Sequence, residues 1–307
     1  MIKTSYNLIT VLGPTASGKT NFAASLALKL EGEIISADSR QVYRKMDLGT
    51  GKDYDDYEVE GRKIKHHLID VVDSGYKYSV FEFQRDFLEA YEKIHEKSSF
   101  PILCGGTGMY IEAAVKGFKL IKVAPDTELR KNLETKSKPE LQTILSSLTK
   151  VHNVSDTSSK KRMIRAIEIH KYYEDNPAEN QNYPKINNLF VGINIDRISR
   201  RRKISERLKS RLDAGMIKEV EDLLESGITA EDLIFYGLEY KYLTNYIIGN
   251  TSYEEMFKGL ETAIHQFAKR QMTWFRGMER RGMKIHWLDA YMPNEEKVEM
   301  VDGWLKV

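Results

Sequence analysis

The segment GPTASGKT, at residues 13–20, could bind phosphate because two glycines, a lysine and a threonine stand in the spacing G-x-x-x-x-G-K-[ST]. The glycines let backbone N–H groups turn inward around phosphate oxygens, and a helix that begins here adds its positive end. Lys19 can neutralise a terminal phosphate, and the Thr20 hydroxyl can bind Mg²⁺. The apolar run NLITVLG before the segment and the helical pattern after it argue against a chance match. The candidate residues are Gly13, Pro14, Thr15, Ala16, Ser17, Gly18, Lys19 and Thr20.

One carboxylate could act together with this loop. Asp38 follows the apolar run EIISA, so we expect it near the 13–20 loop, at the same edge of a sheet. It could accept a proton from an incoming nucleophile, or it could cap a turn with Ser39. The run FPILCGGTG ends in two glycines and Thr107, without the acidic residue that usually helps a nucleoside triphosphatase to hold its metal. This absence weakens an interpretation as an ATPase.

Basic side chains are concentrated in three helical patterns. They are either the solvated faces of a highly charged protein or contacts to RNA phosphates. Acidic residues are scarce within them, which favours RNA. The third pattern also carries Trp274 and Phe275, on which unpaired bases could stack. The three clusters are Lys160, Lys161, Arg162 and Arg165; Arg200, Arg201, Arg202 and Lys203; and Lys269, Arg270, Arg276, Arg280 and Arg281.

The elements that would position these residues alternate along the chain. Short apolar runs recur, and helical patterns lie between several of them. Strands that alternate with helices predict a parallel sheet covered on both faces, whose ligands gather at the carboxyl ends of the strands. Residues 199–226 and 253–281 form long helical patterns in the second half. The expected strands lie in NLITVLG, EIISADS, HHLIDVVD, FPILCGGT, LFVGINID and KIHWLD.

One segment interrupts this alternation, because the pattern between about residues 125 and 188 predicts helices and no strand. We therefore expect an α/β fold, with a P-loop-type parallel sheet, helices on both faces and a helical insertion domain. The expected boundaries are 1–122 for the first part of a catalytic core, 123–188 for the insertion, and 189–307 for the second part of the core with its basic–aromatic helix.

Composition narrows the cellular context. The 307 residues include 41% apolar and 30% charged residues, and the net charge of +2 neither favours nor excludes a polyanionic partner. A single cysteine, Cys104, excludes an intramolecular disulfide, and its apolar surroundings predict burial. The N-terminus lacks a signal-peptide pattern, and no apolar run approaches the roughly 20 residues of a membrane span. We expect a soluble, cytoplasmic protein without a membrane partner.

Six blocks of the sequence follow one another in a characteristic order. They are GPTASGKT, SADSRQVYRKMDLGTGK, HHLIDV, GGTGMY, KKRMIRAIEI and AKRQMTWFR. Together they resemble the tRNA dimethylallyltransferases, also called tRNA isopentenyltransferases, from Asn7 to about Asp289. The resemblance implies Mg²⁺-dependent transfer of a dimethylallyl group from its pyrophosphate to N6 of the adenine on the 3′ side of the anticodon. It also implies a monomer, and a loop that holds a pyrophosphate leaving group.

The resemblance assigns roles at the loop. Thr15, Lys19 and the neighbouring amides would grip the pyrophosphate as negative charge develops on it. Thr20 would bind Mg²⁺. Asp38 would accept a proton from the adenine amine, and Thr107 would place its hydroxyl near the reacting centre and the pyrophosphate.

A pyrophosphate-binding arginine is also implied. Arg207, eight residues before Gly215, has the spacing of the family's arginine. Arg211, where the family usually has an apolar residue, lies one helical turn further on and shares its face. Either side chain could reach the phosphates, and a solvated basic face is the alternative. We expect Arg207 to act as the catalytic arginine.

The implied partner is the anticodon stem-loop of tRNA. A stacked adenine must be extruded to reach a deep pocket, and phosphate contacts and stacking would offset the cost. The family's RNA contacts fall on three segments of this chain. They are Asp38, Ser39, Arg40 and Gln41; Lys161, Arg162, Met163, Ile164 and Arg165; and Lys269, Arg270, Gln271, Trp274 and Arg276.

Three other functions stay open. An isopentenyltransferase acting on free adenine nucleotides would share the loop and Asp38, but it would not need the insertion or the basic–aromatic helix. A small-molecule kinase would use ATP and require a metal-binding carboxylate or an arginine-rich lid. A P-loop RNA-binding switch module without catalysis would leave Asp38 and Thr107 idle.

Overall fold

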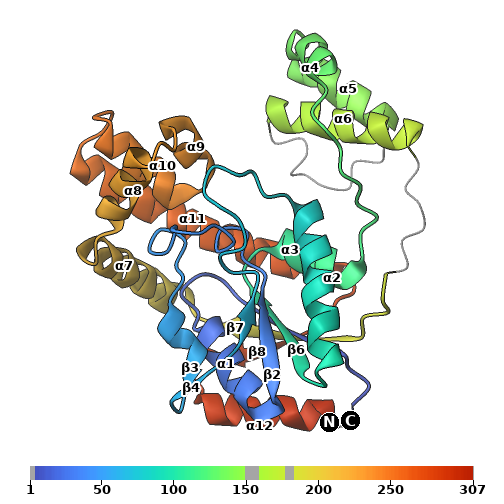
Figure 1. Ribbon diagram of the computed structural model, residues 1–307, viewed down its shortest axis with the longest axis vertical. Coiled ribbons are helices and arrows are strands. Elements are labelled where there is room, and N and C mark those ends of the chain that lie inside the picture. Colours follow the sequence, from blue (N-terminus) through green and yellow to red (C-terminus); the bar gives the residue numbers. More distant parts are fainter. Residues whose placement is uncertain (1–3, 149–158, 177–182, 307) are drawn as a thin grey trace. The chain divides into compact units, whose positions relative to one another are not determined.

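The computed structural model describes residues 4–148, 159–176 and 183–306 (Figure 1). The chain forms two compact units. One combines Met1–Gly117 with Lys185–Val307, and the other is Phe118–Pro184. We had expected the second unit at residues 123–188.

The larger unit is built on a six-stranded sheet in which all strand pairs are parallel and the order is β5–β2–β6–β1–β7–β8. Leu12 in β1 lies opposite Gly105 in β6, and Ser36 in β2 lies opposite Cys104. The carboxyl ends of these three strands therefore lie side by side. The strands are β1 (Leu8–Leu12), β2 (Gly32–Ser36), β5 (His66–His67), β6 (Phe100–Gly105), β7 (Asn188–Asn194) and β8 (Ile285–Asp289).

Helices cover both faces of the sheet, because side chains that alternate along the strands enter two different cores. Ile9 and Val11 pack in one cluster with side chains of α1 (Lys19–Leu30) and α12 (Asn294–Leu305). Leu8 and Leu12 pack in the other, with side chains of α2 (Val80–Glu96), α3 (Gly108–Lys116) and α11 (Tyr253–Arg280). All four strand residues are fully buried, as a strand covered on both faces requires. The predicted α/β fold is confirmed (Figure 1).

Of the two long helices predicted for the second half of the chain, one forms as a single helix and the other is divided. The pattern over residues 253–281 corresponds to the single helix α11, which ends at Arg280 and begins with a capping box between Ser252 and Glu255. The pattern over residues 199–226 is divided, because Gly215 adopts a φ of 103°, which ends one helix and starts another. The remaining elements of this unit are η1 (Tyr54–Tyr57), β3 (Glu58–Val59), β4 (Arg62–Lys63), α7 (Arg197–Asp213), α8 (Met216–Glu225), α9 (Ala230–Phe235) and α10 (Leu238–Ile247).

The strand expected over HHLIDVVD is much shorter in the structure. It ends at His67, because Leu68 and Asp70 have φ values of 62° and 55°, in the left-handed region that a strand excludes. Pairing resumes only as an isolated bridge between Val72 and Tyr43. The turn brings an Asp70 carboxylate oxygen to the buried ammonium of Lys52.

In its described residues the smaller unit contains three helices and no strand, in line with the helical pattern of the sequence. They are α4 (Thr127–Glu134), α5 (Lys138–Leu148) and α6 (Lys160–Asp175). Leu141 and Met163 belong to its small apolar core. The buried Glu168 carboxylate holds the helices by accepting hydrogen bonds from Arg130, Arg165 and the Asp126 amide.

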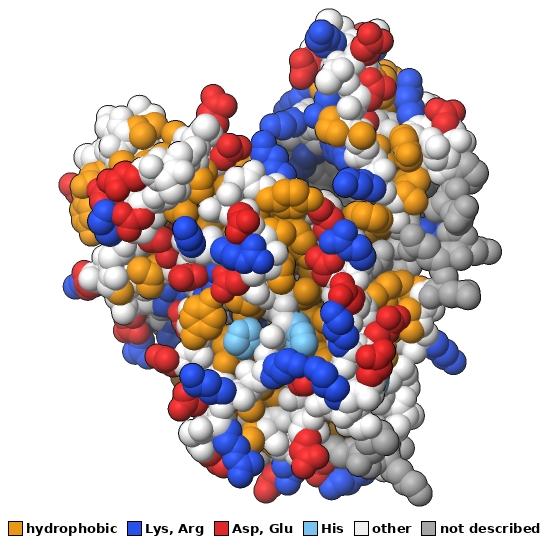
Figure 2. Space-filling view, in the orientation of Figure 1, with side chains coloured by type: hydrophobic (Ala, Val, Ile, Leu, Met, Phe, Trp, Pro, Cys, Tyr) orange, Lys and Arg blue, Asp and Glu red, His pale blue; other side chains and the backbone are white. Residues whose placement is uncertain are grey.

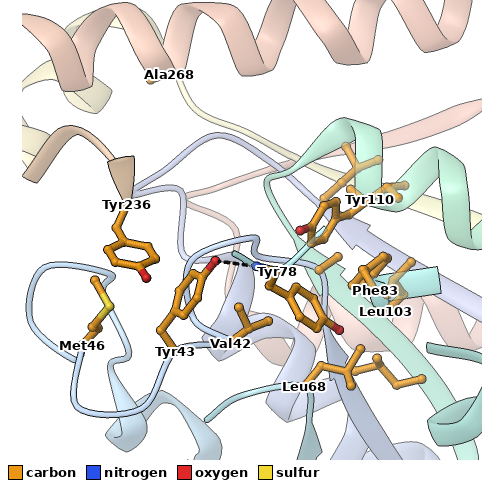
Figure 3. Close-up of a cluster of buried hydrophobic side chains, with 14 of the residues drawn as sticks. Val42, Tyr43, Met46, Leu68, Tyr78, Phe83, Leu103, Tyr110, Tyr236 and Ala268 are labelled. Carbon is orange, nitrogen blue, oxygen red and sulfur yellow. Dashed lines mark hydrogen bonds between the residues drawn. The ribbon is translucent and has the colours of Figure 1, made fainter. Parts of the chain in front are cut away.

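Residues 37–53 form a long segment that begins at the end of β2, and its middle is clamped at several points. Tyr43 packs edge-on against Tyr236 with 4.6 Å between ring centroids, and its hydroxyl accepts the Tyr78 amide at 3.2 Å (Figure 3). Glu219 of α8 accepts three consecutive amides of the segment, from Asp47 to Gly49, at 2.7–3.0 Å. These contacts therefore fix the backbone conformation of the 37–53 segment, although it contains no helix or strand.

Cys104 is buried, as predicted, and burial raises the pKa of its thiol to about 12. On the face shown in Figure 2, Lys and Arg side chains of the larger unit are interspersed with Asp and Glu, in keeping with the net charge of +2. Within the described ranges, no helix is long and apolar enough to cross a membrane.

Candidate functional site

The 13–20 loop follows β1 and leads into α1. Ala16 and Gly18 have φ values of 60° and 80°, so left-handed residues recur within the turn. Such a turn directs successive amides inward, as an anion-binding loop requires. No side chain caps the first turn of α1, and the buried Ser17 hydroxyl has no hydrogen-bond partner within the described residues. Donor groups therefore remain available for an anion at this position.

Lys19 is the first residue of α1 and lies among other charges. Burial lowers the pKa of its ammonium, and the Arg207 charge lowers it further, whereas the carboxylates of Asp38 and Asp56 act in the opposite direction. Lysine, arginine and Asp38 therefore interact electrostatically at one edge of the sheet. This is the proximity of Asp38 to the loop that the strand pattern predicts.

The 13–20 loop is tied to the neighbouring strand by Gln271 of α11. Its Oε1 accepts the Thr15 amide at 2.9 Å, and its Nε2 donates to the Gly106 carbonyl at 3.0 Å. The side chain is only 7% exposed. The expected contact of Gln271 with tRNA stays a prediction, while both ends of the buried amide are engaged within the protein.

Asp38 and Thr107 meet across the ends of β2 and β6. The Thr107 hydroxyl accepts the Ser39 amide at 3.2 Å, while Asp38 Oδ1 accepts the Arg40 amide at 2.9 Å. The latter bond is the turn cap that was the alternative role for Asp38. Its Oδ2 has no hydrogen bond among the described residues, so the half-buried carboxylate keeps one oxygen for another partner.

Two arginines of α7 reach the loop region, and one acidic residue bridges them. Arg207 Nη1 lies 3.4 Å from Thr15 Oγ1, whereas Arg211 has no described hydrogen bond to the loop, so Arg207 is the arginine that contacts the loop. Asp53 accepts from Nη2 of both, at 2.5 Å from Arg207 and 2.9 Å from Arg211. Sequence reasoning missed Asp53. The acidic run DYDD directly after TGK was the available signal.

A hollow opens beside these groups. Apolar side chains make up most of its lining, and the guanidinium groups and the Glu239 carboxylate are its charged members. Burial raises the pKa of Glu239, which Arg211 and Arg207 partly oppose. The lining residues are Thr15, Ala16, Ile204, Arg207, Leu208, Arg211, Met216, Glu239 and Ile264.

Other residues expected at the RNA interface have structural roles. Met163 and Ile164 are 1% and 6% exposed in the core of the smaller unit, so the expected RNA contact at these two positions stays a prediction that their side chains do not favour. Gln41 uses its amide to join Ser36 to the Gly51 carbonyl. In the same unit as Met163, Lys161 and Arg162 are exposed, whereas Arg165 is paired with Glu168.

On α11, the residues expected to contact RNA likewise include both side chains with internal partners and exposed charges. Trp274 is half-buried against Gly108, and its Nε1 donates to the buried Glu112 carboxylate at 2.8 Å. Lys269, Arg270 and Arg276 are exposed. Of the fourteen residues expected to bind RNA, the exposed charges fit that role better than the buried ones do.

A separate arginine cluster joins α11 to the start of α7. Burial lowers the pKa of Arg200, and the positive charges of Arg197 and Arg276 lower it further, while the Asp196 carboxylate opposes them only in part. In the described part of the chain, none of the three has an ion pair with a carboxylate within 4.0 Å. Clustered cations without a carboxylate partner are typical of a surface that binds a polyanion.

The sheet, the 13–20 loop and the charges beside it define an α/β protein of the kind that holds phosphorylated ligands at the carboxyl edge of a parallel sheet. The family model described as IPP transferase matches residues 41–278. A tRNA dimethylallyltransferase 2 of Bacteroides fragilis is 61% identical over 306 residues, which cover 100% of this chain and 99% of the relative. The chain therefore belongs to the tRNA dimethylallyltransferase family, and the resemblance seen in the sequence is confirmed.

Solved structures agree with this placement. The full-length tRNA isopentenylpyrophosphate transferase of Bacillus halodurans superposes with a TM-score of 0.71 at 31% identity, covering 98% of this chain and 95% of that one. A eukaryotic dimethylallyltransferase acting on tRNA superposes with a TM-score of 0.77 at 21% identity and covers 98% of this chain and 79% of that one. The latter likeness shows the common fold.

Proposed function

We propose that this protein transfers a dimethylallyl group from dimethylallyl pyrophosphate to N6 of the adenine 3′-adjacent to the anticodon of tRNA, releasing pyrophosphate. The observation that carries the proposal is the grouping of an anion-binding loop, Lys19 and Arg207 with the Asp38 carboxylate at one sheet edge. Relatives about 60% identical that are named tRNA dimethylallyltransferases support it. The family resemblance implies a monomer, and we propose that the protein acts in the cytoplasm.

In the reaction, the N6 nitrogen forms a bond to C1 of the dimethylallyl group, and the bond between C1 and the pyrophosphate oxygen breaks. The electron pair of that bond leaves with pyrophosphate. Lys19, Arg207 and the loop amides would stabilise the charge that develops there. Asp38 would take the proton that N6 loses, through the oxygen that the Arg40 amide does not use.

A magnesium ion could be held at this site jointly by the donor's phosphates and by Thr20. No group of three or more His, Cys, Asp or Glu side chains in the described ranges could hold a metal by itself. Thr20 supplies a hard oxygen directly beside Lys19, and Mg²⁺ commonly binds through one or two protein oxygens together with phosphates and water. Bound there, the ion would neutralise charge on the departing pyrophosphate.

One assay tests the function against its alternatives. The purified protein is incubated with Mg²⁺, labelled dimethylallyl pyrophosphate and either unmodified tRNA or AMP. We expect label in tRNA alone, at the adenine beside the anticodon. Label in AMP would instead support an enzyme acting on free nucleotides, and transfer to neither would leave the kinase or the switch module. Omitting Mg²⁺ should abolish transfer.

The arginine cluster of α7 and α11 should hold RNA phosphates. The double variant Arg200→Gln/Arg276→Gln should raise the KM for tRNA roughly tenfold with little change in kcat. The slope of log affinity against log salt concentration should fall in magnitude by about 0.7–0.9 for each phosphate that the variant no longer neutralises. Filter binding at several salt concentrations measures the slope.

Lys209→Gln is the matched control for charge loss, because Lys209 is exposed on the same helix, α7, and has no described ion pair. It should change the affinity less than twofold. An unchanged salt slope in the double variant would contradict the assignment of this cluster to RNA.

A further inference from the structure

The Asp53 carboxylate lies between the two arginines of α7 and uses a separate oxygen for each. Oδ2 is 2.5 Å from Arg207 Nη2, and Oδ1 is 2.9 Å from Arg211 Nη2. Burial alone would raise the pKa of Asp53, but the two guanidinium groups outweigh it and hold that pKa below its usual value. The carboxylate is therefore a charged bridge rather than an incidental surface group.

This bridge determines which nitrogen of Arg207 faces the loop. A guanidinium is a planar, rigid fork, so fixing one terminal nitrogen sets the direction of the other. With Nη2 held by Asp53, Nη1 points to Thr15 Oγ1 in the 13–20 loop, 3.4 Å away. The arginine is oriented toward the expected position of the pyrophosphate before any donor arrives.

The backbone around Asp53 is itself held in place. The Asp53 carbonyl accepts the Asp56 amide at 3.1 Å, which starts η1. The preceding residue, Lys52, has a fully buried side chain, and its ammonium donates to the Tyr43 carbonyl at 2.6 Å. Gly51 lets the Arg211 guanidinium pass close by, because a Cβ at this position would overlap it.

Without this carboxylate, the two arginines would face each other as like charges. The Arg207 charge already lowers the pKa of Arg211, after burial as the larger cause. Like charges at this separation move apart unless an anion lies between them. Before donor binding, Asp53 is the anion that keeps both side chains beside the loop.

We propose that Asp53 is a positioning residue for the donor: it holds the outer nitrogens of Arg207 and Arg211 so that Arg207 presents Nη1 to the pyrophosphate. The inference rests on the proposed function, in which the 13–20 loop holds pyrophosphate. It assigns a task to a residue that makes no contact with the reacting atoms.

The test uses the full chain and inorganic pyrophosphate, titrated by calorimetry in the presence of Mg²⁺. Asp53→Ala should weaken pyrophosphate binding roughly tenfold, because an arginine that is no longer oriented must be ordered by the ligand. Asp53→Asn should lie between this variant and the wild type, since one oxygen can hold only one arginine. The KM for dimethylallyl pyrophosphate should rise by the same factor, while kcat changes less than threefold.

The matched control is Asp55→Asn, which removes the same charge two residues away, where the side chain is exposed and bonds neither arginine. It should change pyrophosphate binding less than twofold. A general electrostatic effect has the opposite sign, because removing a negative charge strengthens anion binding. Equal or tighter pyrophosphate binding by Asp53→Ala would therefore overturn the positioning role.

A double-variant cycle separates positioning from a general structural role. In an Arg207→Gln/Arg211→Gln background, Asp53→Ala should have no further effect on pyrophosphate binding, whereas damage to the fold would persist. Asp53 is 43% exposed at its side chain, so its replacement leaves no cavity. If the wild-type protein bound no pyrophosphate, the proposed function would fail; if it bound pyrophosphate and the cycle showed no coupling, only the role of Asp53 would fail.

Discussion

Asp38→Asn should lower the rate of dimethylallyl transfer to tRNA by roughly a hundredfold to ten-thousandfold, the range expected for loss of a general base. Asparagine has nearly the same shape and keeps an oxygen for the Arg40 amide, which Asp38 Oδ1 accepts at 2.9 Å. The turn after β2 should therefore persist while the proton acceptor is lost. Single-turnover transfer with saturating tRNA and donor measures the chemical step.

A comparison with Asp38→Ala distinguishes the two roles of this side chain. If Asp38 served only the turn, asparagine would retain activity and alanine would lose it. If Asp38 accepts the proton, both variants lose activity to a similar degree. The affinity for tRNA should stay within about threefold of the wild type in Asp38→Asn, since phosphate contacts supply most of the binding free energy. Full activity of this variant would remove the catalytic role of Asp38.

Lys19→Met should lower transfer roughly a hundredfold to a thousandfold, as expected when one preorganised group facing a developing negative charge is removed. Each tenfold corresponds to about 1.4 kcal/mol of transition-state stabilisation. Methionine retains the length and the apolar stem of lysine, so the half-buried packing of this residue should persist. The affinity for inorganic pyrophosphate should also fall, whereas binding of tRNA should change little.

Lys29→Met is the control for Lys19, because Lys29 is exposed in the last turn of the same helix, α1. Its transfer rate should stay within twofold of the wild type. Thermal unfolding of both variants should match the wild type within a few degrees. If Lys19→Met lost activity only in proportion to a loss of folded protein, the electrostatic role of this lysine would be wrong.

The sequence predicts the sheet and its helices because burial on both faces leaves continuous apolar runs such as NLITVLG. It also places Asp38 near the 13–20 loop, since neighbouring parallel strands end at one edge. The error at HHLIDVVD has a local cause: Leu68 and Asp70 adopt left-handed backbone conformations, which are rare for leucine and are tolerated by aspartate. Met163 and Ile164 could have been assigned to the core, because Ile167 continues an apolar stripe at helical spacing.

Contacts between residues that are far apart in the sequence could not be predicted from local sequence patterns. Asp53 and Arg207 are 154 residues apart, and Gln271 meets Thr15 across 256 residues. When an Asp or Gln lies in a charged segment, the sequence around it does not indicate which side chain it will contact in the folded protein. These pairings arise only when α7 and α11 pack onto the rest of the larger unit, so they follow from the assembled fold rather than from local pattern.

The 37–53 segment carries the proton acceptor at one end and the arginine bridge at the other. Its centre is gripped by Tyr236 and by Glu219, neither of which approaches the 13–20 loop through any described hydrogen bond. The group that would activate the amine and the group that orients the pyrophosphate-binding arginine thus belong to one continuous segment of the chain. We expect a substitution that repacks the tyrosine pair to displace both ends of this segment, and so to change turnover without altering any group that meets a substrate.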